Sequence, residues 1–189
     1  KMFSCNMTIL GDKAQTIAGK QQDVLTFLPK IFGKKVKRIV MNKSYRNTSE
    51  IAEYAKSVGG SKDIQYVARH GKAVERHAIK TLEKTCKEIS EKLKLREEEY
   101  ETAAILTMTE KEAEHIQEIM HKLGAEAHYI NRDSAQFKKG LTVTTYYLAK
   151  GLEFDQVFVV GGDRNNKMYQ GYQYICATRA LHELYVYDA

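Results

Sequence analysis

Short apolar runs rich in β-branched residues alternate along this chain with longer segments whose apolar residues recur at helical spacing. This alternation predicts an α/β fold with a mostly parallel sheet and helices on both faces, because parallel strands need crossover connections and helices usually supply them. The expected strands are Met7–Leu10, Val36–Met41, Ala103–Met108, His128–Ile130, Leu141–Thr145, Val157–Val160 and Leu184–Tyr187. We also expect a hairpin formed by Ile64–Ala68 and Val74–Ile79.

Four segments have the apolar spacing or the capping residues of helices. Asn47 with Glu50, and Thr109 with Glu112, have the spacing of capping boxes. Glycines follow two of the segments, as they often do at helix ends. The expected helices are a segment from about 47–49 to Gly59, Thr81–Glu99, a segment from Thr109 to Gly124, and Tyr174–Leu181, with a further short helix inside the irregular stretch 13–35.

The composition is that of an ordinary globular protein. The chain has 189 residues, of which 43% are hydrophobic and 29% charged, so it can bury one substantial core. The net charge of +6 permits a polyanionic partner without requiring one. Three cysteines with no CxxC spacing argue against a disulfide framework or a zinc site, and no apolar run approaches the ~18 residues of a membrane span. We expect a cytoplasmic protein.

The stretch from Thr142 to Asp155 contains the strongest local signal for a ligand site. A β-branched strand leads into a turn at Lys150-Gly151, and Glu153 and Asp155 follow before the next apolar run. Ligands of parallel sheets gather outside the carboxyl ends of the strands, so we expect this turn to lie at such an edge.

Three further stretches carry candidate phosphate-binding side chains. Gln15, in GDKAQTI, offers a carboxamide that can both donate and accept hydrogen bonds. Arg46, in NKSYRNTSEI, and Arg179, in YQYICATRAL, offer planar guanidinium groups that suit phosphate oxygens. Taken singly, each of these residues is more commonly an ordinary turn or surface residue.

These four stretches together resemble motifs III, IV, V and VI of superfamily 1 helicases of the UvrD/Rep type, in the same order. The run YLAKGLEFD is most similar to motif V of the HelD, or DNA helicase IV, branch. The resemblance extends from Gly11 to Ala180, which is nearly the whole chain, and it implies a RecA-like domain.

The resemblance implies a role for each matching residue. Arg46 and Arg179 would neutralise charge on the γ-phosphate of ATP, and Gln15 would sense that phosphate. Glu153 would contact the nucleotide sugar, with Gly151 and Tyr45 beside it, whereas Thr145 and Lys150 would contact nucleic acid. No metal ligand is implied. We therefore expect Arg46, Glu153 and Arg179 to meet on one rim of the folded domain.

The chain contains no P-loop of the form GxxxxGK[ST]. The resemblance thus implies that residues 1–189 are the second, C-terminal RecA-like domain of a larger protein. ATP and Mg²⁺ would be held mainly by an N-terminal RecA-like domain, and this fragment would be inactive alone.

Two partners and three functional classes stay open. DNA, single-stranded or duplex, is the partner implied for a helicase or translocase. RNA polymerase is the alternative, because Tyr147 stands where DNA helicases have a histidine, and no large insertion separates Arg46 from Glu153. A binding module without enzymatic activity is the third possibility.

Overall fold

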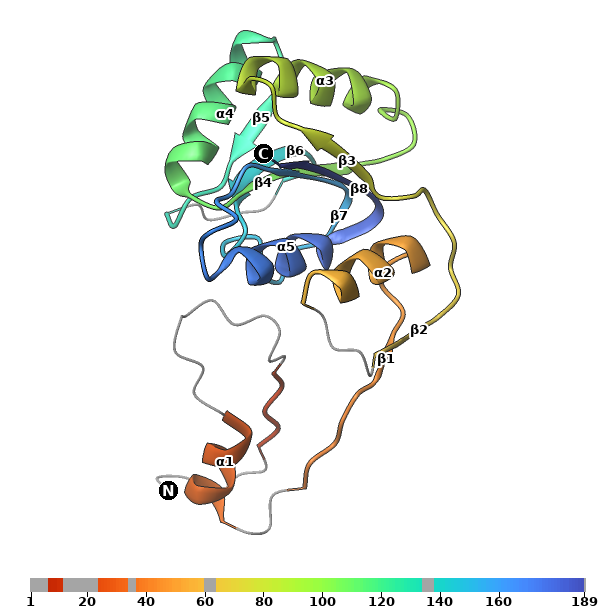
Figure 1. Cartoon of the computed structure of the whole chain (residues 1–189), viewed down its shortest axis with the longest axis vertical. Coiled ribbons are helices and arrows are strands. Elements are labelled where there is room, and N and C mark those ends of the chain that lie inside the picture. The colour runs from red at the N-terminus through yellow and green to blue at the C-terminus, as the bar shows by residue number, and fades with distance from the viewer. Residues whose placement is uncertain (1–6, 12–23, 34–36, 60–63, 134–137, 189) are drawn as a thin grey trace.

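A six-stranded parallel β-sheet forms the centre of the protein (Figure 1). The computed structural model describes residues 7–11, 24–33, 37–59, 64–133 and 138–188. In spatial order the strands are β3 (Glu75–Ala78), β8 (Ala180–Asp188), β7 (Phe154–Val160), β4 (Thr102–Thr107), β6 (Gly140–Thr145) and β5 (Ala127–Tyr129). Every neighbouring pair is parallel, which confirms the predicted sheet type.

Helices cover both faces of this sheet, as the alternating pattern predicts. The covering helices are α2 (Ser49–Ser57), α3 (Leu82–Lys94), α4 (Glu110–Lys122) and α5 (Tyr169–Ala177), whereas α1 (Val24–Phe32) lies apart from the sheet (Figure 1). On one face α2 and α5 pack over β4, β7 and β8, and on the other α3 and α4 do so. Strand β4 shows the alternation directly, because Ala104 and Leu106 face the first layer while Ala103 and Ile105 face the second.

The helix starts are determined by local side-chain chemistry. The capping box at α4 is confirmed, with Thr109 accepting from the Glu112 backbone and Glu112 accepting from the Thr109 backbone. At α2 the cap is Thr48, whose hydroxyl accepts from the Ile51 N–H, and not the predicted Asn47. Asn47 turns inward instead and binds backbone carbonyl groups of another segment, as described below.

The predicted hairpin is wrong. Strand β2 (Gln65–Tyr66) pairs in parallel with β1 (Lys43–Ser44) in a small separate sheet, whereas β3 pairs in parallel with β8 of the main sheet. The apolar pattern indicated two strands correctly but carried no information about their partners. Each strand found a partner far away in sequence, which local spacing cannot reveal.

The strands predicted at Met7–Leu10 and Val36–Met41 are also wrong. Residues 7–11 and 37–42 have no regular secondary structure and are exposed. A strand needs a neighbour to satisfy its backbone groups, and no described segment pairs with these two. Their apolar side chains therefore remain in solvent, including Leu10 at 77% and Met41 at 76% relative exposure.

Several element boundaries differ from the prediction. Helix α3 ends at Lys94 and not near Glu99, and α5 spans Tyr169–Ala177, so it starts and ends earlier than expected. Strand β8 is correspondingly longer than predicted and starts at Ala180. Arg179 therefore lies between a helix and a strand, not on a helix as the motif resemblance implied. Within the described ranges, no helix is both long and apolar enough to cross a bilayer.

Candidate functional site

Arg46 lies in the short loop between β1 and the start of α2. The next residue, Asn47, is buried, and its side-chain amide donates to the Ala180 carbonyl at 2.6 Å and more weakly to the Ala177 carbonyl at 3.4 Å. These two carbonyls flank the turn between α5 and β8. The Arg46 loop is thereby attached to the segment that contains Arg179.

Glu153 and Arg179 occupy equivalent places at the amino ends of adjacent strands. Glu153 directly precedes β7 and Arg179 directly precedes β8, and the Phe154 N–H donates to the Arg179 carbonyl at 2.9 Å. The expectation that Glu153 lies at a carboxyl edge is therefore wrong. The connection from β6 must return across the sheet before a parallel strand can begin, and this return carries Glu153 to the amino edge.

The three residues come together at this edge, as expected. The Arg46 Nε atom lies 2.6 Å from a Glu153 carboxylate oxygen, and both side chains are about two-fifths exposed, at 44% and 39%. Arg179 lies beside them, because Phe154, next to Glu153, donates to its carbonyl, and Asn47, next to Arg46, donates to the carbonyl of Ala180. Arg46, more than a hundred positions before the other two residues, thus joins them in one cluster.

Arg179 is buried, with only 2% of its surface exposed. Its guanidinium group donates to the Leu152 carbonyl at 3.2 Å and to the Thr178 hydroxyl at 3.1 Å, while Nε has no hydrogen-bond partner among the described residues. Removal from water lowers the pKa of Arg179, and the positive charge of Arg46 lowers it further, whereas Glu153 opposes this shift. Arg179 is therefore a buried cation with one donor that no described residue uses.

The other predicted site residues lie at varying distances from this cluster. Gly151 lies in the turn before Glu153 with φ at +95°, a conformation that favours glycine, and Tyr45 is 70% exposed just before Arg46. Lys150 is exposed in the same turn, but Thr145 is buried at the carboxyl end of β6, and its hydroxyl has no partner within the described structure. Gln15 lies outside the described residues.

Arg69 is a neighbour of the cluster that sequence reasoning missed. One of its terminal nitrogens donates to the Arg46 carbonyl at 2.6 Å and to the Leu181 carbonyl at 2.5 Å. It lies in a stretch with no motif and no apolar periodicity, so no sequence signal marked it. Of Arg46, Arg69 and Arg179, only Arg46 forms an ion pair with a carboxylate in the part of the chain that the structure describes.

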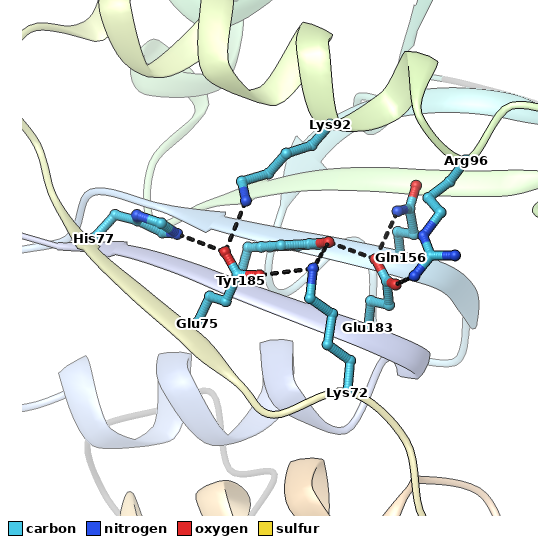
Figure 2. A network of polar contacts seen from close by, with 8 residues as sticks. All are labelled: Lys72, Glu75, His77, Lys92, Arg96, Gln156, Glu183 and Tyr185. Carbon is cyan, nitrogen blue, oxygen red and sulfur yellow. Dashed lines mark hydrogen bonds and ion pairs between the residues drawn. The ribbon is translucent and has the colours of Figure 1, made fainter.

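Figure 2 shows a second polar cluster, which joins side chains of β3, β7, β8 and α3 with those of neighbouring loops. Glu75 accepts from Lys72, Lys92 and His77, and Figure 2 shows how Lys72 and Tyr185 connect it to the buried Glu183. Burial by itself would raise the pKa of Glu75, but these hydrogen bonds outweigh burial and lower it to about 2. Each carboxylate here is paired with cationic or hydrogen-bonding side chains of the protein itself, so we interpret this cluster as structural.

The described residues contain no group of three or more His, Cys, Asp or Glu side chains that could hold a metal ion. The amino-edge cluster instead gathers guanidinium groups, which bind planar or tetrahedral oxyanions through paired N–H donors. Guanidinium groups of this kind can bind phosphate oxygens.

Comparison with solved structures agrees with the α/β fold described above. The chain superposes on the crystal structure of the C-terminal domain of a possible DNA helicase from Lactobacillus plantarum WCFS1 with a TM-score of 0.64 and 24% sequence identity, over 77% of this chain and 88% of that one. The fold is therefore the RecA-like α/β fold of that domain. The helicase of PRRSV matches over 78% of this chain and 22% of its own, with 12% identity and a TM-score of 0.38, which is too low to support an argument. No protein-family model and no curated protein matches this chain.

Proposed function

We propose that this chain is the second RecA-like domain of an ATP-dependent DNA helicase or translocase, and that it contributes arginines to an ATP site shared with a first domain. The observation that carries the proposal is the cluster of Arg46, Glu153 and Arg179 at one edge of the sheet. These are the residues that the motif resemblance assigns to the nucleotide. The likeness to the C-terminal domain of a possible DNA helicase supports the same assignment.

The electrostatics of the cluster fit a polyphosphate. Arg46 and Arg179 carry like charges that repel each other, and the Nε atom of Arg179 is buried without a partner among the described residues. A phosphate oxygen near these groups would offset the repulsion, and it could accept from the unused Nε donor once the buried Arg179 side chain turns outward. Glu153 orients Arg46 through their ion pair, and its remaining lone pairs could accept from a sugar hydroxyl.

When bound, ATP with Mg²⁺ would supply the phosphoanhydride whose cleavage drives movement. In this proposal Arg46 and Arg179 face the charge that develops on the terminal phosphoryl group, a contribution of about 10³–10⁵ in rate for such arginines. Tyr45, Gly151 and Gln15 would lie around the nucleotide. The Mg²⁺ ligands and the P-loop would come from the first domain.

Exposed apolar side chains near the start of the chain support a neighbouring domain. Met7, Ile9 and Leu10 are exposed, as are Ile39 and Val40. Large apolar residues that gather in one exposed patch often mark an interface. We propose that the first RecA-like domain covers them.

The nucleic-acid contacts are proposed at the turn after β6. Lys150 is exposed there and can reach a phosphate. Thr145 is buried at the carboxyl end of β6, so the structure around it would have to open before its unpartnered hydroxyl could bind a phosphate. DNA would be gripped chiefly through its phosphates, so binding should weaken with salt.

Substitution of the two arginines in the full-length protein tests the proposal. Arg46→Ala and Arg179→Ala should each lower ATP turnover by about 10³–10⁵ while the affinity for a fluorescent ATP analogue changes by less than ~10-fold. Arg132→Ala is the matched control, because Arg132 is 75% exposed and follows β5 at the other end of the sheet. Near-normal turnover in both arginine variants would refute the proposal, as would ATP hydrolysis by the isolated chain.

One observation favours the alternative partner, RNA polymerase. The Tyr147 hydroxyl donates to Glu110 at 2.5 Å, so this side chain is tied into the domain and is not presented to DNA. The strands and helices described between Arg46 and Glu153 are also only those already assigned, α2 to α4 and β2 to β6. Stimulation of turnover by core RNA polymerase, and not by single-stranded DNA, would favour this alternative. A protein that neither binds nor hydrolyses ATP would point to a binding module.

A further inference from the structure

The segment 69–72, which leads from β2 to β3, lies across the start of α2 and contacts it through backbone and side chains. The Ser49 N–H donates to the Arg69 carbonyl at 2.8 Å, and the Gly71 N–H donates to the Glu50 carboxylate at 2.9 Å. A side chain at position 71 would place its Cβ 2.6 Å from a methyl carbon of Thr48, so only glycine allows this close approach.

The side chain of Arg69 joins the two segments that contain the arginines of the site. Its Nη2 atom donates to the carbonyl of Arg46 itself and to the carbonyl of Leu181, two residues beyond Arg179. The bonded positions are 23 and 112 residues away in sequence, so this contact is purely tertiary. One guanidinium group therefore spans the gap between both arginine-bearing segments.

This link matters because the two arginines repel each other. Both side chains are cationic, and the charge of Arg46 lowers the pKa of Arg179. Strand β1, which precedes Arg46, has only two residues and pairs only with β2 among the described strands, so it gives the loop little support. Asn47 holds the loop from the buried side and Arg69 holds it from the exposed side.

We propose that Arg69 is a positioning residue, which sets the separation of the Arg46 and Arg179 guanidinium groups by binding the backbone of both segments. This inference rests on the proposed function. Arg69 acts through the placement of Arg46, and its hydrogen bonds go to carbonyl groups of the protein. A misplacement of catalytic groups by about 1 Å can cost about 10²-fold in rate.

A double-mutant cycle in the full-length protein tests this role. Arg69→Met keeps much of the side-chain length and removes the donors, and it should lower the single-turnover rate of ATP hydrolysis by about 10–100-fold with KM for ATP changed by less than ~3-fold. In an Arg46→Ala background the same change should have almost no further effect, within ~2-fold, because the group that it positions is already gone. A purely structural contribution would instead lower the rate by the same factor in both backgrounds.

The possible outcomes separate the inference from the proposed function. Normal turnover in Arg69→Met, an additive loss in the double mutant, or a raised KM at unchanged kcat would each overturn the role of Arg69 while leaving the role of Arg46 intact. Normal turnover in both Arg46→Ala and Arg179→Ala would overturn the proposed function itself. If Arg69→Met does not fold, Arg69→Lys, which keeps N–H donors without the planar fork, should show a smaller loss with the same dependence on Arg46.

Discussion

Arg179→Met separates a structural role of this arginine from a ligand-directed one. The substitution keeps an unbranched side chain of similar length in the buried site but removes the charge and all donors. If Arg179 is an anchor of the fold, removal of a buried, well-paired charge group should lower the free energy of unfolding by about 3–5 kcal/mol. If its geometry serves a ligand, the cost should be much smaller.

The structure supports the smaller value. Two hydrogen bonds, at 3.2 Å and 3.1 Å, would be lost, which costs about 1.5–3 kcal/mol each at most for a charged donor. Against this, Nε is buried without a partner in the described structure, which itself costs about 1–3 kcal/mol, and a desolvated cation next to Arg46 would disappear. These contributions nearly cancel, so we expect a change of less than ~1.5 kcal/mol in either direction.

Urea denaturation of the isolated chain measures this free energy, and thermal melting provides a second estimate. For a domain of this size, 1 kcal/mol corresponds to about 2–4 °C in Tm, so the melting temperature should move by less than ~6 °C. In the full-length protein, turnover should still fall by about 10³–10⁵. Arg132→Met, at a 75% exposed site, is the control and should change stability by less than ~1 kcal/mol. A loss of more than ~3 kcal/mol in Arg179→Met would refute the ligand-directed interpretation.

Three further predictions concern the frame around the site. Glu75→Gln should destabilise the chain by about 1–2 kcal/mol at pH 7, and the difference should shrink as pH falls from about 4.5 towards 2, because the folded pKa of about 2 is depressed and its stabilisation is lost on protonation. Tyr172→Phe should lower the free energy of unfolding by about 1–3 kcal/mol, because the single proton of its buried hydroxyl is shared between the Leu106 carbonyl at 3.1 Å and the Val160 carbonyl at 3.0 Å. Gly71→Ala should cost about 1–3 kcal/mol through its clash with Thr48, and Thr48→Ser, which removes the clashing methyl group, should restore most of it.

Chemical denaturation at several pH values measures all three variants. A constant effect of Glu75→Gln between pH 7 and pH 3 would show that its ionised form does not stabilise the fold. An unchanged midpoint in Tyr172→Phe would show that the two carbonyls find other partners. For Gly71→Ala, an equal cost in the wild-type and Thr48→Ser backgrounds would rule out the predicted steric contact.

The class of fold was predictable because its signals are local. Apolar spacing in Ala103–Met108 and Val157–Val160 marks buried strands, and the Thr109–Glu112 box marks the start of α4, without reference to any distant residue. The hairpin prediction failed because the two strands do not pair with each other: β2 pairs with β1, and β3 pairs with β8. Apolar runs at 7–10 and 36–41 misled for the same reason, since composition favours a strand but only a neighbour completes one.

By itself the sequence determined which side chains were candidates, because Arg46, Glu153 and Arg179 stand out through their motif context alone. Tertiary structure alone decided that they meet at the amino edge of the sheet, that Arg179 is buried, and that Arg69 joins the segments on either side. The physical reason is that side-chain type and short-range spacing are properties of the sequence itself. Burial, pairing and charge proximity depend instead on how crossover connections bring distant segments together.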